Sequence, residues 1–218
     1  MKEMCFLFAL LMGCGSWGLA QSSSPWSFGL LLYPNQSVKS EASAIIVDYV
    51  DGASTSSEES KLAFAFGGTV SYQISQHWEI QSGLLFDDKG YKIEEEFNRT
   101  NTGPGKATYN VHVNYLDIPF MIRYKFGQNC VRFFLGSGIS SDFFLNKSGN
   151  IPEDFYPEYD FKTVGFTHLI SLGGEWKFND KMRCVLEPMI RYPLVNYGST
   201  STFKPGSVGV NLSFAYSL

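Results

Sequence analysis

A strict alternation between bulky apolar residues and small or polar residues recurs along this chain and constrains its fold more than any other feature. In SVGVNLSFAYSL, residues 207–218, every even position from Val208 to Leu218 is apolar, and every odd position is small or polar. Successive side chains of a β-strand point to opposite sides, so this period of two predicts a strand with one apolar face. No convincing helical periodicity follows the first twenty residues.

The alternation predicts eight strands, which begin near residues 26, 61, 78, 115, 131, 166, 182 and 207. One face of each strand carries Phe, Leu, Ile, Trp and Tyr, and the other carries Gly, Ala, Ser, Thr and charged residues. Tyr109, Val111 and Val113 have the opposite phase, which predicts a bulge or the end of the buried zone near Tyr115. The 16% aromatic residues and 21 glycines agree with strands and turns.

The connections between the predicted strands alternate in length. Short hairpin turns are expected at 75–77, 127–129 and 179–180, and longer polar loops at 34–60, 89–107, 146–160 and 198–206. The short turns and both termini therefore lie at one end of the sheet, and the long loops lie at the other.

The distribution of side-chain size decides which face is inside. The interior of an eight-stranded barrel is only wide enough for its own side chains, so the bulky face would overfill it and must point outward. An outward band of that size is stable only in lipid, where closure also pairs every backbone group. The sequence predicts an all-β protein, a closed antiparallel eight-stranded transmembrane up-and-down β-barrel over residues 21–218. A soluble lipocalin-like ligand carrier remains an alternative.

The first twenty residues, MKEMCFLFALLMGCGSWGLA, have the form of a signal peptide. A lysine precedes a short apolar core, and small residues at Gly18 and Ala20 predict cleavage after Ala20. Cleavage before Cys14, as in a lipoprotein, is the rival interpretation. Both predict export, and cleavage after Ala20 leaves Cys130 and Cys184, which we expect to be free thiols because they fall two strands apart on opposite faces.

Three stretches carry a family resemblance: SYQISQHWEIQSGLLFDDKGYK, YLDIPFMIRYKFG and RFFLGSGISSDFFL. They resemble the PorT-type outer-membrane β-barrel proteins of Bacteroidota, which share the eight-stranded architecture of OmpA and OmpX. Tyr115–Pro119, YLDIP, is the most specific part. The resemblance implies an outer-membrane location and this fold. PorT itself is associated with protein secretion, but no residue of this chain supports assigning it the same role.

No catalytic, cofactor-binding or metal site is predicted. His77, His112 and His168 are too scattered for a metal site, and a net charge of -4 argues against nucleic acid as a partner. In the lipid A deacylases, which are also eight-stranded barrels, the catalytic His and Ser lie two apart on one face of a strand. His168 and Ser171 are three apart and fall on opposite faces, so we expect no enzyme.

Charged residues on the small-residue face are expected to pair with one another inside the barrel. These are Glu79, Asp117, Arg123, Arg132, Glu175, Arg183, Glu187 and Arg191. A lumen filled by such pairs is the main expectation, and a narrow channel or a lipid-facing enzyme on the same barrel is the alternative.

The expected role is structural or interactive at the cell envelope, with both termini in the periplasm. Expected partners are outer-membrane lipid and the barrel-insertion machinery. Residues 207–218 resemble the carboxy-terminal signal that this machinery reads, with Leu218 in place of the usual Phe. The loops DGASTSSEES and NKSGNIPEDFYPEYD are acidic, and they either contact a protein or glycan partner or simply ring the barrel mouth.

Overall fold

The computed structural model describes residues 24–39, 45–49, 52–99, 103–127, 131–149, 161–198 and 203–218. Every regular element in these ranges is a β-strand. The strands are β1 (Trp26–Lys39), β2 (Ile45–Tyr49), β3 (Gly52–Glu59), β4 (Leu62–Gln73), β5 (Trp78–Asp88), β6 (Tyr91–Arg99), β7 (Gly103–Phe126), β8 (Val131–Gly149), β9 (Val164–Lys177), β10 (Met182–Pro193) and β11 (Pro205–Ser217). No helix in the described residues is long and apolar enough to cross a membrane.

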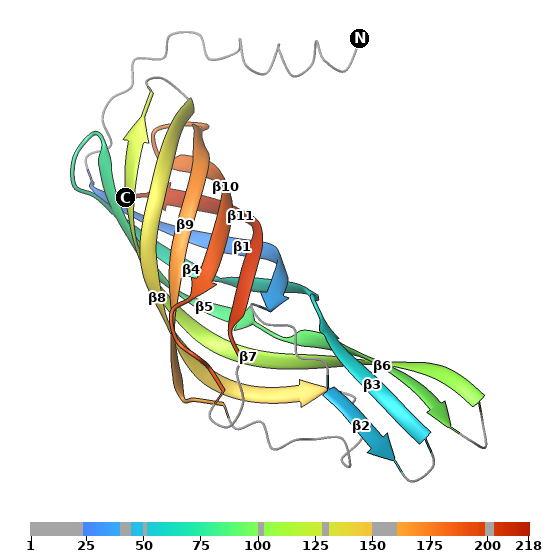
Figure 1. Cartoon of the computed structure of the whole chain (residues 1–218). Helices are drawn as coiled ribbons and strands as arrows, with labels where there is room; N and C mark the ends of the chain where they lie inside the picture. The colour runs from blue at the N-terminus through green and yellow to red at the C-terminus, as the bar shows by residue number, and fades with distance from the viewer. Residues whose placement is uncertain are drawn as a thin grey trace, which may run out of the picture.

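Eight of these strands close into an antiparallel barrel (Figure 1). Its order is β7-β5-β4-β1-β11-β10-β9-β8, and the pairing of β7 with β8 completes the ring. Each of the eight segments predicted from the alternation forms one strand of this ring. The fold class is therefore confirmed, and because the ring is closed it leaves no unpaired edge within the wall.

The regular C-terminal segment is the closing strand of the barrel. β11 pairs with β10 on one side and with β1 on the other. Beyond the strand, the Leu218 backbone N–H donates to the Trp26 carbonyl at 3.2 Å. The end of the chain is hydrogen-bonded on both edges, which explains why its alternation continues to the last residue.

Polar side chains and one glycine form the predicted short turns. Ser75 Oγ accepts the backbone N–H groups of His77 and Trp78, and Asn179 Oδ1 accepts those of Lys181 and Met182. At the end of β7, Gly127 has a φ of 93°, a left-handed conformation that glycine adopts without strain. The tight connections all lie at one end of the barrel, as predicted.

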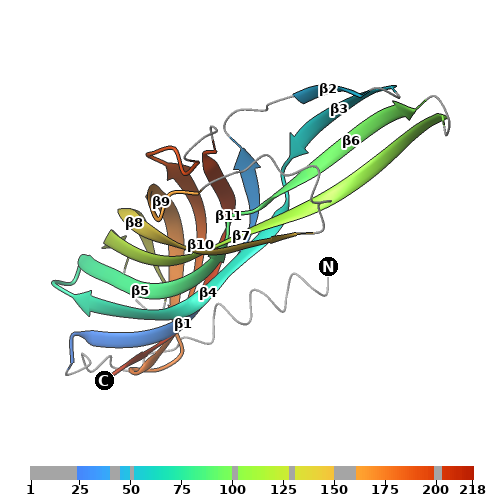
Figure 2. The same cartoon turned by 90° about the horizontal axis from the view of Figure 1, so that it is seen from below.

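A second sheet protrudes from the opposite end, where the sequence predicted polar loops. β2, β3 and β6 pair in that order with the first half of β7, which runs without a break into the barrel wall (Figure 2). The expectation of loops over 34–60 and 89–107 was therefore wrong. β3 has small or polar residues on both faces and lacks the apolar alternation that identifies a strand, and backbone pairing with β2 and β6 holds it in the sheet.

The predicted irregularity near Tyr115 is a register shift between β7 and β8. Asn114 pairs with Asn146, whereas Tyr115 pairs with Phe144, so Leu145 is the extra residue and the bulge lies on β8. The inward face of β7 continues past this point. It changes there from charged residues to the buried side chains of Val111, Val113 and Tyr115.

Some predictions fall outside the described residues. These are the signal peptide of residues 1–20 with its rival site at Cys14, the thiol of Cys130, and residues 150–160 of the second acidic loop. Cys184 lies on β10 and is a free thiol.

Candidate functional site

The barrel interior is filled by side chains in three layers, the first of which is an ionic cluster near the short turns. Glu79 and Glu175 lie on opposite sides of the lumen, and Lys125 Nζ binds both, at 2.7 Å from Glu79 Oε2 and 2.7 Å from Glu175 Oε2. Arg183 Nη1 bridges the same two carboxylates at 2.7 and 3.1 Å. Arg132, nearer the rim, pairs with the other oxygen of Glu175. Each carboxylate is thus shared by several cations, as buried charges require.

Glu187 connects four strands at the edge of this cluster that is farther from the short turns. It accepts from Ser171 Oγ on β9 and Asn211 Nδ2 on β11, both at 2.6 Å, and forms an ion pair with Arg123 on β7. The Arg123 guanidinium lies over the Phe134 ring, 4.7 Å from its centroid, so β8 also contacts this group.

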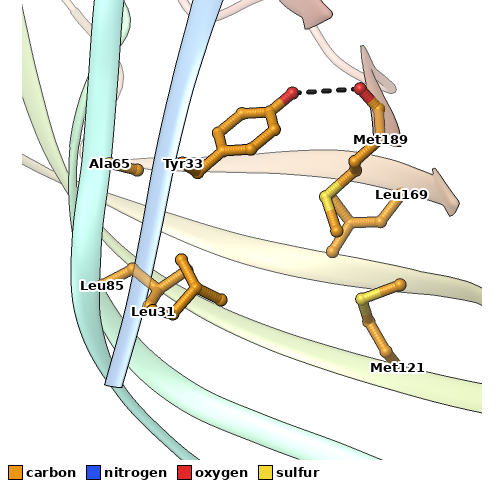
Figure 3. Packing of buried hydrophobic residues seen from close by; sticks show 7 residues of the cluster. All are labelled: Leu31, Tyr33, Ala65, Leu85, Met121, Leu169 and Met189. Carbon is orange, nitrogen blue, oxygen red and sulfur yellow. Dashed lines mark hydrogen bonds between the residues drawn. The ribbon is translucent and has the colours of Figure 1, made fainter. Parts of the chain in front are cut away.

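The middle layer is apolar. Leu31, Tyr33, Ala65, Leu85, Met121, Leu169 and Met189 are buried against one another across the lumen (Figure 3). Tyr33 satisfies its hydroxyl by donating to the Met189 carbonyl at 3.1 Å. The alternation did not predict this layer, because only small and charged residues were expected inside.

A second ionic cluster lies on the other side of the apolar layer, toward the protruding sheet. Lys89 Nζ is within 2.6 Å of Asp87, 2.8 Å of Asp117 and 3.5 Å of Asp142. Arg191 Nη1 pairs with Asp87 at 2.6 Å and with Asp117 at 3.1 Å. Two cations therefore face three carboxylates, all of them buried.

Tyr197, in the segment after β10, closes this cluster. Its hydroxyl donates to Asp142, and Thr167 Oγ1 donates to the same carboxylate at 2.6 Å. Burial raises the pKa of Tyr197, which keeps its hydroxyl protonated as a donor. An apolar cap covers the cluster, formed by Tyr91, Val111, Val113, Tyr115, Tyr197 and Phe203.

All eight charged residues predicted to face inward do so, and each has an ionic partner within the lumen. Four further members were missed. Asp87, Lys125 and Asp142 occupy the wet face of their predicted strands, so the alternation alone could have identified them. Lys89 was assigned to a loop, and only the continuation of β5 toward β6 brings it into the lumen.

A smaller polar cluster lies where the barrel meets the protruding sheet. Lys61 Nζ is 2.8 Å from Asp88 Oδ2 and 2.6 Å from His112 Nδ1, which in turn is 2.7 Å from the same carboxylate oxygen. Asp88 Oδ1 accepts the Gly90 backbone N–H at 3.0 Å. These contacts connect β4, β5 and β7 at the base of the sheet, which is a structural role.

The three histidines lie apart, as predicted, and no group of metal-ligating side chains is found in the described residues. His168 and Ser171 lie on opposite faces of β9: Ser171 contacts Glu187 inside, while His168 faces outward. His168 has a different partner that the sequence did not reveal, since Ser137 Oγ on β8 lies 3.1 Å from its Nε2 atom.

The outer surface of the barrel is apolar around its whole circumference. Leu30, Leu62, Phe120, Leu172 and Phe214 are 73, 83, 52, 53 and 62% exposed, and similar residues lie beside them on every strand of the ring. An apolar belt around a closed barrel with a charged interior is the defining arrangement of a transmembrane β-barrel.

The sequence profile of the outer membrane protein beta-barrel domain matches residues 19–217. The chain therefore belongs to this family and is an outer-membrane β-barrel protein with a lumen filled by side chains. No curated protein matches its sequence.

Solved structures with a similar fold are outer-membrane proteins of low sequence identity. OprG from Pseudomonas aeruginosa is 12% identical, over 91% of this chain and 97% of OprG, with a TM-score of 0.49. Neisserial surface protein A is 11% identical, over 87% of this chain and 96% of its own, with a TM-score of 0.49. Outer Membrane Protein W of E. coli is 13% identical, over 90% and 100% of the two chains, with a TM-score of 0.42.

Proposed function

We propose that this protein is an anchored interaction module, in which the filled barrel holds the protruding sheet of β2, β3, β6 and the first half of β7 against a protein or glycan partner. The observation that carries this proposal is the continuity of β7, a single strand of 24 residues that belongs to both the barrel and the sheet. A rigid connection of this kind fixes the direction and distance of the sheet from the membrane.

The proposal includes a cell-envelope position, with both termini in the periplasm and the protruding sheet outside the cell. It is supported by the placement of Trp26 and Leu218 together at the short-turn end, and by the rule that outer-membrane barrels have short periplasmic turns. We also propose membership of the PorT-type group of Bacteroidota and cleavage of a signal peptide after Ala20. The YLDIP stretch at Tyr115–Pro119 and the leader-like first twenty residues support these proposals.

We propose that the barrel neither conducts nor catalyses. A conducting pore needs a continuous polar path, whereas the apolar layer around Leu85, Met121 and Leu169 separates the two ionic clusters of this lumen. The clustered charges are held by one another in ion pairs, which suits a structural filling. The lumen acts as the rigid base of the sheet.

The protruding sheet presents charged side chains on one of its faces. Glu59 lies 3.5 Å from Lys92, which also pairs with Glu94, and Lys106 pairs with Glu96. The hydrogen bond between Lys92 and Glu94 raises the pKa of the lysine and lowers the pKa of the carboxyl group. Both groups remain charged at neutral pH, so the surface offers a mixed ionic pattern to a polar partner.

The test removes the sheet and keeps the barrel. One variant lacks residues 40–58 and 94–107, and a matched control replaces only the short turn at 75–77 with Gly and Ser. A photo-cross-linking residue replaces Thr108 in the intact protein, the control and the deleted variant, and it reports on neighbours in the native outer membrane. We expect the intact protein and the control to form the same discrete cross-linked species, and the deleted variant to lose it while still inserting.

Heat-modifiable migration on a gel confirms barrel insertion for each variant. The same cross-linked species in the deleted variant, or none in the intact protein, would contradict the interaction role.

A further inference from the structure

His168 is an ionisable side chain on the lipid-facing surface of the barrel. The outward positions of β8 up to Phe143, of β9 and of β10 hold no other His, Asp, Glu, Lys or Arg. Polar groups in the hydrocarbon region are unfavourable and mark functional positions by default. A half-buried imidazole on this surface therefore needs an explanation that barrel stability does not supply.

The surroundings of His168 are apolar except for one hydroxyl. It lies opposite Ile139 on β8 and Tyr192 on β10, which are 50 and 58% exposed. Ser137, exposed on the same face, places Oγ 3.1 Å from His168 Nε2. Ser137 is itself flanked by Ile122 and Ile170, so the two polar side chains form an isolated pair within the apolar belt.

The position of the pair along the barrel identifies the lipid region that it meets. His168 lies two residues, about 7 Å along the strand, from Phe166 toward the short-turn end, and eight residues before Trp176. Aromatic residues gather at the two membrane interfaces, and Phe166 and Tyr192 lie near the ends of their strands closest to the protruding sheet. The pair is thus just inside the interface, at the depth where acyl chains join a lipid head group.

Hydrogen-bond counting shows what the pair lacks. If Ser137 donates to Nε2, the imidazole proton is on Nδ1 and points away from the bond. If Nε2 donates to Ser137, the serine hydroxyl is the donor that has no acceptor. The side chains of Ser137 and His168 make no other hydrogen bond to the described residues, so either arrangement leaves one side-chain donor facing lipid without an acceptor.

We propose that Ser137 and His168 form a binding site for the carbonyl group of a lipid acyl linkage, an ester or an amide, in the leaflet nearer the protruding sheet. A carbonyl is the acceptor that membrane lipids present at this depth, and it matches the single free donor. Tyr192 lies opposite His168 in the register of β9 and β10. The site holds one lipid at a fixed position on the β8–β10 surface.

The same geometry favours binding over cleavage of the acyl bond. Acyl transfer needs donors that stabilise an oxyanion and a third group that orients the histidine. In this part of the wall, β8 and β9 pair continuously from Val131 to Phe143, so their backbone N–H groups are engaged in the ladder. The outward positions beside His168 supply no carboxylate.

The test uses two bilayers that differ only in the proposed acceptor. The full chain is labelled with ¹⁵N-histidine and placed in nanodiscs of diester phosphatidylethanolamine or of its diether analogue, which lacks carbonyl groups. The chain has three histidines, and the ring signals of His77 and His112 serve as internal controls. We expect the ring ¹⁵N signals of His168 to shift between the two lipids and the other two residues to remain unchanged.

Two variants make the result specific. Ser137→Ala removes the hydroxyl that orients the ring, and we expect it to abolish at least half of the lipid-dependent shift. Ser141→Ala, an outward serine on the same strand, is expected to keep the shift. Identical His168 signals in the two lipids would overturn the proposal, and so would release of free fatty acid from the diester lipid that depends on Ser137. Insertion is followed separately by heat-modifiable migration.

Discussion

At the scale of single residues, the lumen is held together by carboxylates that each serve several strands. Glu187 is the clearest example, since Arg123, Ser171 and Asn211 converge on it from β7, β9 and β11. Losing one partner from such a group leaves the others buried and unsatisfied. The cost of its loss is therefore larger than the net contribution of the intact pair.

Glu187→Leu is predicted to lower the free energy of unfolding by about 3–5 kcal/mol. The Arg123 charge then stays buried with Glu79 as its remaining carboxylate, which lies 3.5 Å away and is already shared with Lys125 and Arg183. Urea unfolding in detergent micelles, followed by tryptophan fluorescence, measures the change. Adding Arg123→Met should restore part of the loss, since the double variant buries no unpaired charge.

Glu96→Gln is the matched control for that prediction. Glu96 pairs with Lys106, but both side chains are well exposed on the protruding sheet, where ion pairs contribute little. Its unfolding midpoint should equal that of the unmodified protein. A Glu187→Leu variant as stable as this control would show that the ionic layer does not support the barrel.

At the scale of strands, glycine positions make room for rings that fill the lumen. A Cβ atom at Gly173 on β9 would lie 2.3 Å from Cζ of Phe134, the ring on which Arg123 rests. Gly68 on β4 instead faces outward, with nothing within 4 Å of the position of its Cβ atom. The two glycines occupy similar strands but opposite environments.

Gly173→Val is predicted to destabilise the barrel by about 1–3 kcal/mol through overpacking, whereas Gly68→Val should leave stability unchanged or raise it slightly. The same unfolding measurement compares the two. Adding Phe134→Leu should recover much of the loss in Gly173→Val. Equal effects of the two single substitutions would contradict the inward packing of Phe134.

The strands also show where prediction from sequence stops. Alternation identified all eight barrel strands because each has a lipid face and a lumen face of different size. It missed β3, which has small or polar residues on both faces, and it missed β2 and β6, which have 5 and 9 residues and are shorter than every strand of the ring. Lys89 was missed because it follows β5 in a segment predicted to be a loop. The pairing of Ser137 with His168 joins two strands whose register a single sequence does not reveal.

At the scale of the whole molecule, the barrel has one division of its side chains: bulky side chains face lipid, and small or charged side chains face a filled interior. The apolar layer between the ionic clusters modifies this expectation without reversing it. Leu31, Leu85 and Leu169 are buried in the lumen, in one cluster with the small side chain of Ala65. A closed wall with this division positions both the protruding sheet and the lipid-facing pair.

The most direct test of this assignment is the accessibility of spin labels along β11 in lipid bilayers. With Cys130 and Cys184 replaced by serine, single cysteines at positions 208–216 are labelled with a nitroxide and probed by electron paramagnetic resonance. Labels at Leu212 and Phe214 should collide with dissolved oxygen and not with a water-soluble nickel chelate, and a label at Ser213 should be shielded from both. Even-numbered positions that collide with the nickel chelate would contradict the outward, lipid-facing placement of the apolar face.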